Sequence, residues 1–61
     1  MRWVNDDGSI WRLFIDEIND LGVILKSGRR WEWIVFDEYY ECGYSLTAWG
    51  AMSALLKAVR G

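Results

Sequence analysis

The side chains that could perform catalysis are few in this sequence and poorly spaced. The chain has no histidine, the residue that exchanges protons near neutral pH. Cys42 is the single cysteine, so it lacks the imidazole base that activates a thiol nucleophile. Asp16-Glu17 and Asp37-Glu38 are adjacent pairs, and neighbouring residues of a strand point to opposite sides. We therefore expect a protein that is not an enzyme, with no catalytic residue, no cofactor and no small-molecule substrate.

Bases and an aromatic residue occur together in the stretch KSGRRW, as Lys26, Arg29, Arg30 and Trp31. Bases at a hairpin tip can hold phosphates, and an exposed aromatic ring can stack on a base. The same residues also suit a solvated hairpin tip, and the neighbouring Glu32 opposes anion binding. The net charge of −2, from seven bases and nine acids, gives no general attraction to nucleic acid. Nucleic-acid binding through this stretch is therefore the alternative function.

Acids and tyrosines alternate in the stretch DEYYE, as Asp37, Glu38, Tyr39, Tyr40 and Glu41. One interpretation is a polar connection between the sheet and the following segment. The other is a surface for a basic protein partner, because tyrosine gives a large contact area at little entropic cost.

The size of the chain limits how it can be stabilised. Its 61 residues form one domain, 1–61, and a single core of this size is marginal. One cysteine excludes a disulfide within the chain, and a chain with one thiol and no imidazole offers few metal ligands, so we expect no metal site. Five Trp, three Tyr and two Phe favour dense aromatic packing, and oligomerisation is the other route to burial.

The elements that would position these side chains follow from turn signals. Between the turns lie IWRLFID (10–16), VILK (23–26) and RRWEWIVF (29–36), which are rich in β-branched and aromatic residues. Short connections imply antiparallel pairing. Segments 2–4 and 39–45 each offer one more possible strand. The sequence thus predicts an antiparallel sheet of three to four strands, over about residues 2–45.

The last segment changes its hydrophobic period. Trp49, Met52, Leu56 and Val59 recur at helical spacing, and Ala48, Leu55 and Ala58 widen this apolar stripe. Thr47 is a suitable N-cap. We expect one C-terminal helix, over about residues 48–60, packed on one face of the sheet. The predicted fold class is α+β, with the order β-β-β-α.

Strand register decides which residues the helix covers. A three-residue loop, Lys26-Ser27-Gly28, produces a face with almost no polar residue, whereas a two-residue loop at Ser27-Gly28 mixes the faces. We expect the clean arrangement, with the helix on Trp11, Leu13, Ile15, Val23, Leu25, Trp31, Trp33 and Val35.

The opposite face of the predicted sheet mixes large apolar residues with charges. A helix of about 13 residues covers about 20 Å, which is enough for one face only. Either the N-terminal residues cover this second face, or a protein partner or second copy does, since monomers seldom expose large apolar patches. The candidate interface residues on it are Phe14, Ile24, Ile34 and Phe36, together with Arg12 and Glu32.

The C-terminal half carries a pattern of short motifs. Trp31-Glu32-Trp33-Ile34-Val35 is followed by Gly43-Tyr44-Ser45-Leu46-Thr47-Ala48-Trp49-Gly50-Ala51 and an alanine-rich basic helix. This pattern resembles small uncharacterised proteins of actinobacteria and their phages. The resemblance implies a sheet-then-helix unit and a phage origin, and it supplies no active site.

These observations favour a small interaction protein. We expect a phage accessory protein that binds a host or phage protein through the open sheet face and DEYYE, and that self-associates as a homodimer or larger oligomer. No apolar run approaches the roughly 20 residues of a membrane span, and MRWVNDDG lacks the apolar segment of a signal peptide. We therefore expect a cytoplasmic location, in the host cytoplasm if the protein is phage-encoded, and no membrane partner.

Overall fold

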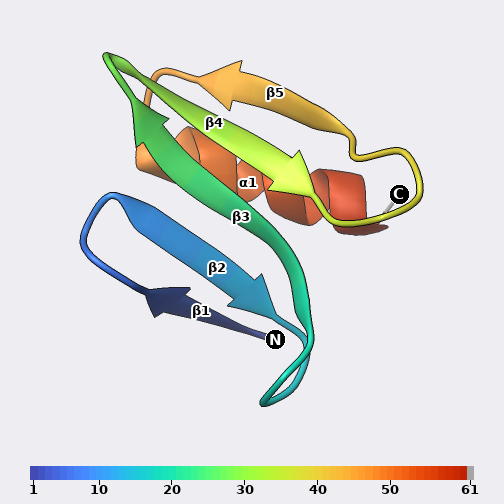
Figure 1. Ribbon diagram of the computed structural model, residues 1–61. Coiled ribbons are helices and arrows are strands. Elements are labelled where there is room, and N and C mark those ends of the chain that lie inside the picture. The colour runs from blue at the N-terminus through green and yellow to red at the C-terminus, as the bar shows by residue number, and fades with distance from the viewer. Residues whose placement is uncertain (61) are drawn as a thin grey trace.

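The computed structural model describes residues 1–60 and consists of a five-stranded antiparallel sheet and one helix (Figure 1). The elements are β1 Arg2–Asn5, β2 Ile10–Phe14, β3 Asp20–Ser27, β4 Arg30–Val35, β5 Cys42–Ser45 and α1 Ala48–Arg60. Strands adjacent in the chain are also adjacent in the sheet. The predicted α+β class with a C-terminal helix is confirmed. The sheet has five strands instead of three to four, because both optional segments form strands.

Short polar turns make consecutive strands pair. In the turn after β1, the side-chain oxygen of Asn5 accepts a hydrogen bond from the Gly8 N–H at 2.7 Å. In the turn after β2, Asp16 Oδ1 accepts from the N–H groups of Ile18 and Asn19, both at 2.9 Å. Such side-chain bonds replace the backbone bonds that a tight turn cannot make. Each turn therefore returns the chain directly beside the previous strand.

The helix lies across β3, β4 and β5 on one face of the sheet (Figure 1). Its first turn is capped by Thr47, whose Oγ1 accepts a hydrogen bond from the Gly50 N–H at 2.9 Å. The opposite face of the sheet carries no helix or strand among the described residues.

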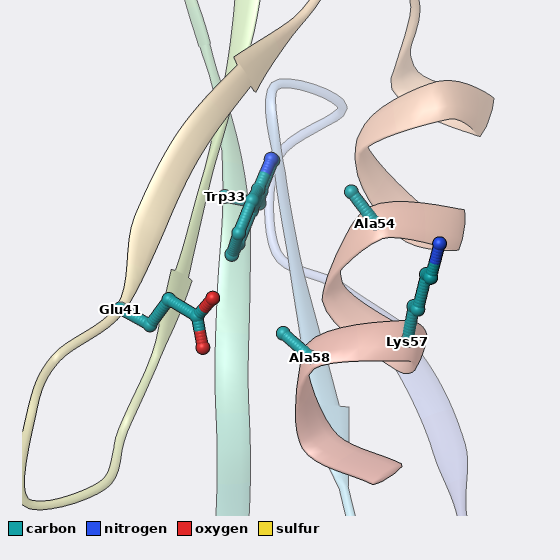
Figure 2. Close-up of a pocket in the computed structure, with 5 residues that line it drawn as sticks. All are labelled: Trp33, Glu41, Ala54, Lys57 and Ala58. Carbon is teal, nitrogen blue, oxygen red and sulfur yellow. The ribbon is translucent and has the colours of Figure 1, made fainter. Parts of the chain in front are cut away.

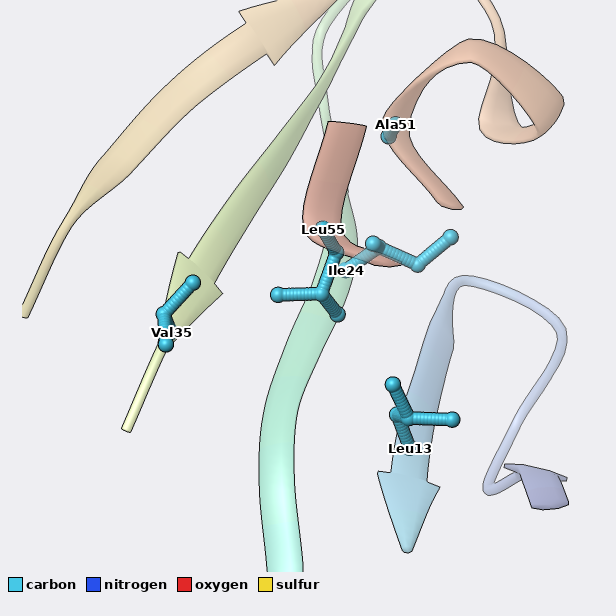
Figure 3. Close-up of a cluster of buried hydrophobic side chains, with 5 residues drawn as sticks. All are labelled: Leu13, Ile24, Val35, Ala51 and Leu55. Carbon is cyan, nitrogen blue, oxygen red and sulfur yellow. The ribbon is translucent and has the colours of Figure 1, made fainter. Parts of the chain in front are cut away.

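The core forms between the sheet and the helix. Its fully buried members are Leu13, Ile24, Val35, Ala51 and Leu55 (Figure 3). Around them pack half-buried tryptophans of the sheet, namely Trp3, Trp11, Trp31 and Trp33. These rings fill space above the sheet, and the helix adds Ala51 and Leu55 to the core.

The predicted helix stripe is wrong at Trp49. Its side chain is 78 % exposed, while Ala51 and Leu55 are fully buried. The stripe that faces the sheet is centred on Ala48, Ala51 and Leu55, with Met52 at its margin. Trp49 lies on the outer surface, because the small residues allow the helix to approach along a different line.

The predicted register of β3 is also wrong. Ser27 pairs with Arg30, so the loop has two residues, Gly28 and Arg29, and Gly28 has a φ of 65°. A positive φ at the first loop position is what a type II′ hairpin turn requires. Ile24 then pairs with Trp33 and is 0 % exposed, so it lies in the core and not on the open face as predicted.

Two glycines permit close packing around this core. A Cβ at Gly22 would lie 2.7 Å from Leu55 Cδ1 and 2.5 Å from the carbonyl oxygen of Ile34. A Cβ at Gly43 would lie 2.7 Å from Trp33 Cζ2. Gly22 therefore lets α1 settle on β3, and Gly43 lets the Trp33 ring lie against β5.

Candidate functional site

The sheet face opposite α1 carries many apolar side chains, and no described helix or strand covers it. We call it the open face. Side chains of residues that pair across neighbouring strands lie on the same face of the sheet, and successive residues of a strand alternate between the two faces. The core residues mark the face that points to the helix, so the residues that alternate with them belong to the open face. The open face consists of Arg2, Val4, Ile10, Arg12, Phe14, Val23, Leu25, Ser27, Arg30, Glu32, Ile34, Cys42 and Tyr44.

The N-terminal residues do not cover this face. Residues 2–5 form β1, which pairs edge to edge with β2 and extends the sheet (Figure 1). That arrangement removes the alternative of a second core closed by the N-terminus. The aliphatic side chains of Val23, Leu25 and Ile34 remain half-buried only by their neighbours in the sheet.

The structure keeps most of the predicted interface residues on the open face. Arg12, Phe14, Glu32 and Ile34 lie there, while Ile24 does not. Phe36 directly follows β4, and its side chain is 41 % exposed. Its N–H donates a hydrogen bond to the Leu21 carbonyl oxygen, which extends the pairing of β3 with β4 by one residue.

Sequence reasoning missed several members of the open face, among them Val4, Val23, Leu25, Arg30, Cys42 and Tyr44. The Gly28-Arg29 turn was the signal that could have placed Val23 and Leu25 correctly. A glycine as the first of two loop residues fixes the pairing of Ser27 with Arg30, and alternation then sets the rest of β3.

Charges on the open face are only partly neutralised within the chain. Arg12 Nε lies 2.8 Å from Asp6 Oδ2, and Arg12 Nη1 lies 3.9 Å from Asp20 Oδ2. The Arg30 guanidinium lies over the Tyr44 ring, 5.1 Å from its centroid. Glu32 has no ion pair among the residues that the structure describes.

The basic residues of the predicted nucleic-acid surface lie at the tip of the β3–β4 hairpin. Lys26, Arg29 and Arg30 are exposed there, and Trp31 is half-buried against the core. Strand pairing puts Lys26 and Trp31 on the helix side, whereas Arg30 contacts Tyr44 on the open face. The fold therefore divides these side chains between two faces.

The DEYYE stretch forms an ordered turn between β4 and β5. Asp37 Oδ1 accepts hydrogen bonds from the N–H groups of Tyr39 and Tyr40, at 2.8 and 2.9 Å. Tyr40 has a positive φ of 47°. Glu38 and Glu41 are exposed, as are the rings of Tyr39 and Tyr40, with exposed fractions of 85 % and 65 %. The turn thus holds two tyrosine side chains in solvent beside acidic groups.

A small pocket lies on the helix side, next to this turn. It has a volume of about 390 Å³ and lies between Trp33 and the Ala54 and Ala58 methyl groups, with Glu41 and Lys57 at its margins (Figure 2). The Glu41 carboxylate points toward the space beside Trp33, and the Lys57 ammonium points away from it. The pocket results from the two alanines, which leave the helix flank over β5 without large side chains.

Hydrogen bonds from the Ile18 N–H, the Asn19 side chain and the Asn19 N–H hold the pKa of Asp16 below its ordinary value of 3.8. This carboxylate stabilises a turn and lies away from the open face.

Within residues 1–60, no three histidine, cysteine, aspartate or glutamate side chains gather as a metal site would require. No helix in the described part of the chain has the length and apolar character to cross a membrane.

Comparison with known proteins returns no relative. No family model, curated protein or solved structure matches this chain. Inference about its function therefore rests on the open face itself.

Proposed function

We propose that this protein is a non-enzymatic interaction protein that binds a protein partner through its open face. The observation that carries the proposal is the asymmetry of the sheet. On one face α1 covers β3, β4 and β5 around a packed core. The other face presents aliphatic and aromatic side chains, with Arg12 and Glu32 among them, and no described helix or strand covers it. Uncovered apolar surfaces of this kind are the usual mark of a binding surface.

The DEYYE turn supports the same function at the edge of the surface. Its two exposed tyrosines provide large, rigid contact area at the border of the open face. Since Phe36 immediately precedes this turn, a partner on the open face could contact both regions.

An affinity capture with matched variants tests this proposal. Wild-type protein, Ile34→Glu and Ile18→Glu are immobilised and exposed to a lysate of the source organism. Ile34 lies on the open face, whereas Ile18 is 83 % exposed in the turn after β2. We expect wild type and Ile18→Glu to retain the same proteins and Ile34→Glu to lose them. Retention of the same proteins by all three folded baits would refute a role for the open face.

A further inference from the structure

We infer that the occupant of the open face is a second copy of this chain, packed face to face about a two-fold axis. This inference rests on the proposed function, because it names the partner of the same surface. Three independent observations support it: the area of the face, the small size of the core, and the arrangement of charge.

The area is compatible with a small dimer interface. The chain measures 29 × 24 × 16 Å along its principal axes, so a face that filled the two longer directions would offer at most roughly 700 Å². A standard interface buries about 800 Å² per partner, which places the open face at the low end of the range. A second copy presents a face of identical dimensions, so the whole surface can be covered at once.

The core is small, so burial of further apolar surface would add substantially to the stability of the chain. Only Leu13, Ile24, Val35, Ala51 and Leu55 are buried hydrophobic residues among those described. Domains of about 60 residues without disulfides or metals are marginally stable, and oligomerisation is a common remedy. Stacking two open faces would bury Val23, Leu25 and Ile34 from both chains and create a second core.

The charges of the face are self-complementary. In the strand register, Arg12 of β2 lies beside Val23 of β3, and Glu32 of β4 lies beside Leu25 of β3. Arg12 and Glu32 therefore lie on opposite sides of β3, two residues apart along the direction of that strand. A two-fold axis in the interface plane, midway between them, brings Arg12 of each copy over Glu32 of the other.

This geometry gives Glu32 the ion partner that it lacks within the chain. A half-buried carboxylate on an apolar surface is costly to cover unless it is paired. Arg12 has five N–H donors, of which its contacts with Asp6 and Asp20 use only some. The same axis stacks Val23 and Leu25 of one copy on those of the other, so apolar contacts occupy the centre and ion pairs flank them.

A charge-exchange experiment tests this geometry. Sedimentation equilibrium is measured for wild type, Glu32→Arg, Arg12→Glu and an equimolar mixture of the two variants. Each variant alone places like charges opposite one another, which should weaken its dimer about tenfold or more. In the mixture, one chain carries two acids and the other two bases at these positions, so both pairs are again opposite in sign. We expect the mixture to recover a dimer with an affinity within about threefold of wild type.

Circular dichroism and urea unfolding of each variant show that loss of the dimer is not loss of the fold. Three results would overturn the inference: a wild-type mass of 7.2 kDa up to about 200 µM, a single variant that dimerises as well as wild type, or a mixture that stays monomeric. The proposed function fails separately, through the lysate capture, because a monomeric chain could still retain another protein that Ile34→Glu loses.

Discussion

Replacement of Gly22 by alanine should destabilise the fold far more than the same change at Gly43. Both new Cβ atoms would lie 2.5–2.7 Å from the nearest atom, but the obstacles differ. At position 22 they are the Ile34 backbone oxygen and the fully buried Leu55, neither of which has space to retreat. At position 43 the obstacle is the Trp33 ring, which borders a pocket of about 390 Å³.

Overpacking of a protein interior costs about 1–3 kcal/mol, at the upper end where neighbours cannot move. We therefore expect Gly22→Ala to lower the free energy of unfolding by about 3 kcal/mol and Gly43→Ala by about 1 kcal/mol. For a chain of this size, whose core supplies roughly 3–5 kcal/mol, the first change should leave little stability.

Urea unfolding followed by circular dichroism, at one fixed protein concentration, measures both values. The fixed concentration matters because dimer formation would add to the apparent stability. Equal losses at the two positions, or a loss below about 1 kcal/mol at Gly22, would refute the close contact between α1 and β3.

Three further changes test other parts of the structure. Thr47→Ala removes the acceptor for the Gly50 N–H and should cost about 1 kcal/mol in urea unfolding, whereas Thr47→Ser should preserve most of it. Asp16 has a folded-state pKa below its unfolded value, so its contribution is present above pH 3.8 and is lost as the pH falls through the lower, folded pKa. Asp16→Asn should therefore reduce the decrease in Tm that occurs as the pH falls through the acidic range. An unchanged decrease in Tm would contradict the hydrogen-bonded turn. Trp49→Ala should cost less than about 0.5 kcal/mol, against about 2–5 kcal/mol for Leu55→Ala, and comparable losses would contradict the orientation of the helix.

Much of the fold could be predicted because local signals were strong. The polar turns are marked by Asn, Asp and Gly, and the change from strand-like to helical period is clear after Ser45. These features predicted the order of elements and the C-terminal helix. Both optional strands formed, because Arg2–Asn5 and Cys42–Ser45 each satisfy one edge of an otherwise shorter sheet.

The hydrophobic pattern of β3 could not show which of its side chains point to the helix. Leu21, Val23, Ile24 and Leu25 make both of its sides apolar, so alternation carries no information there. The tight Gly28-Arg29 turn and the contact of Gly22 with Leu55 decide the register instead. Only a three-dimensional arrangement reveals that second constraint.

The helix stripe failed at Trp49 for a related reason. Trp49 was expected to face the sheet, but the sheet already contributes Trp11, Trp31 and Trp33 to the shared space. Close packing then selects Ala51 on the facing side of the helix and leaves Trp49 outside.

The central claim is that the open face binds a second copy of this chain, and isoleucine methyl signals in nuclear magnetic resonance test it most directly. Ile10 and Ile34 lie on the open face, Ile24 is buried in the core, and Ile18 is exposed in a turn. On dilution of the wild-type protein from about 300 to about 10 µM, we expect the Ile10 and Ile34 signals to shift and those of Ile18 and Ile24 to stay fixed. Shifts confined to Ile18, or signals from Ile10 and Ile34 that do not change with concentration, would contradict the account.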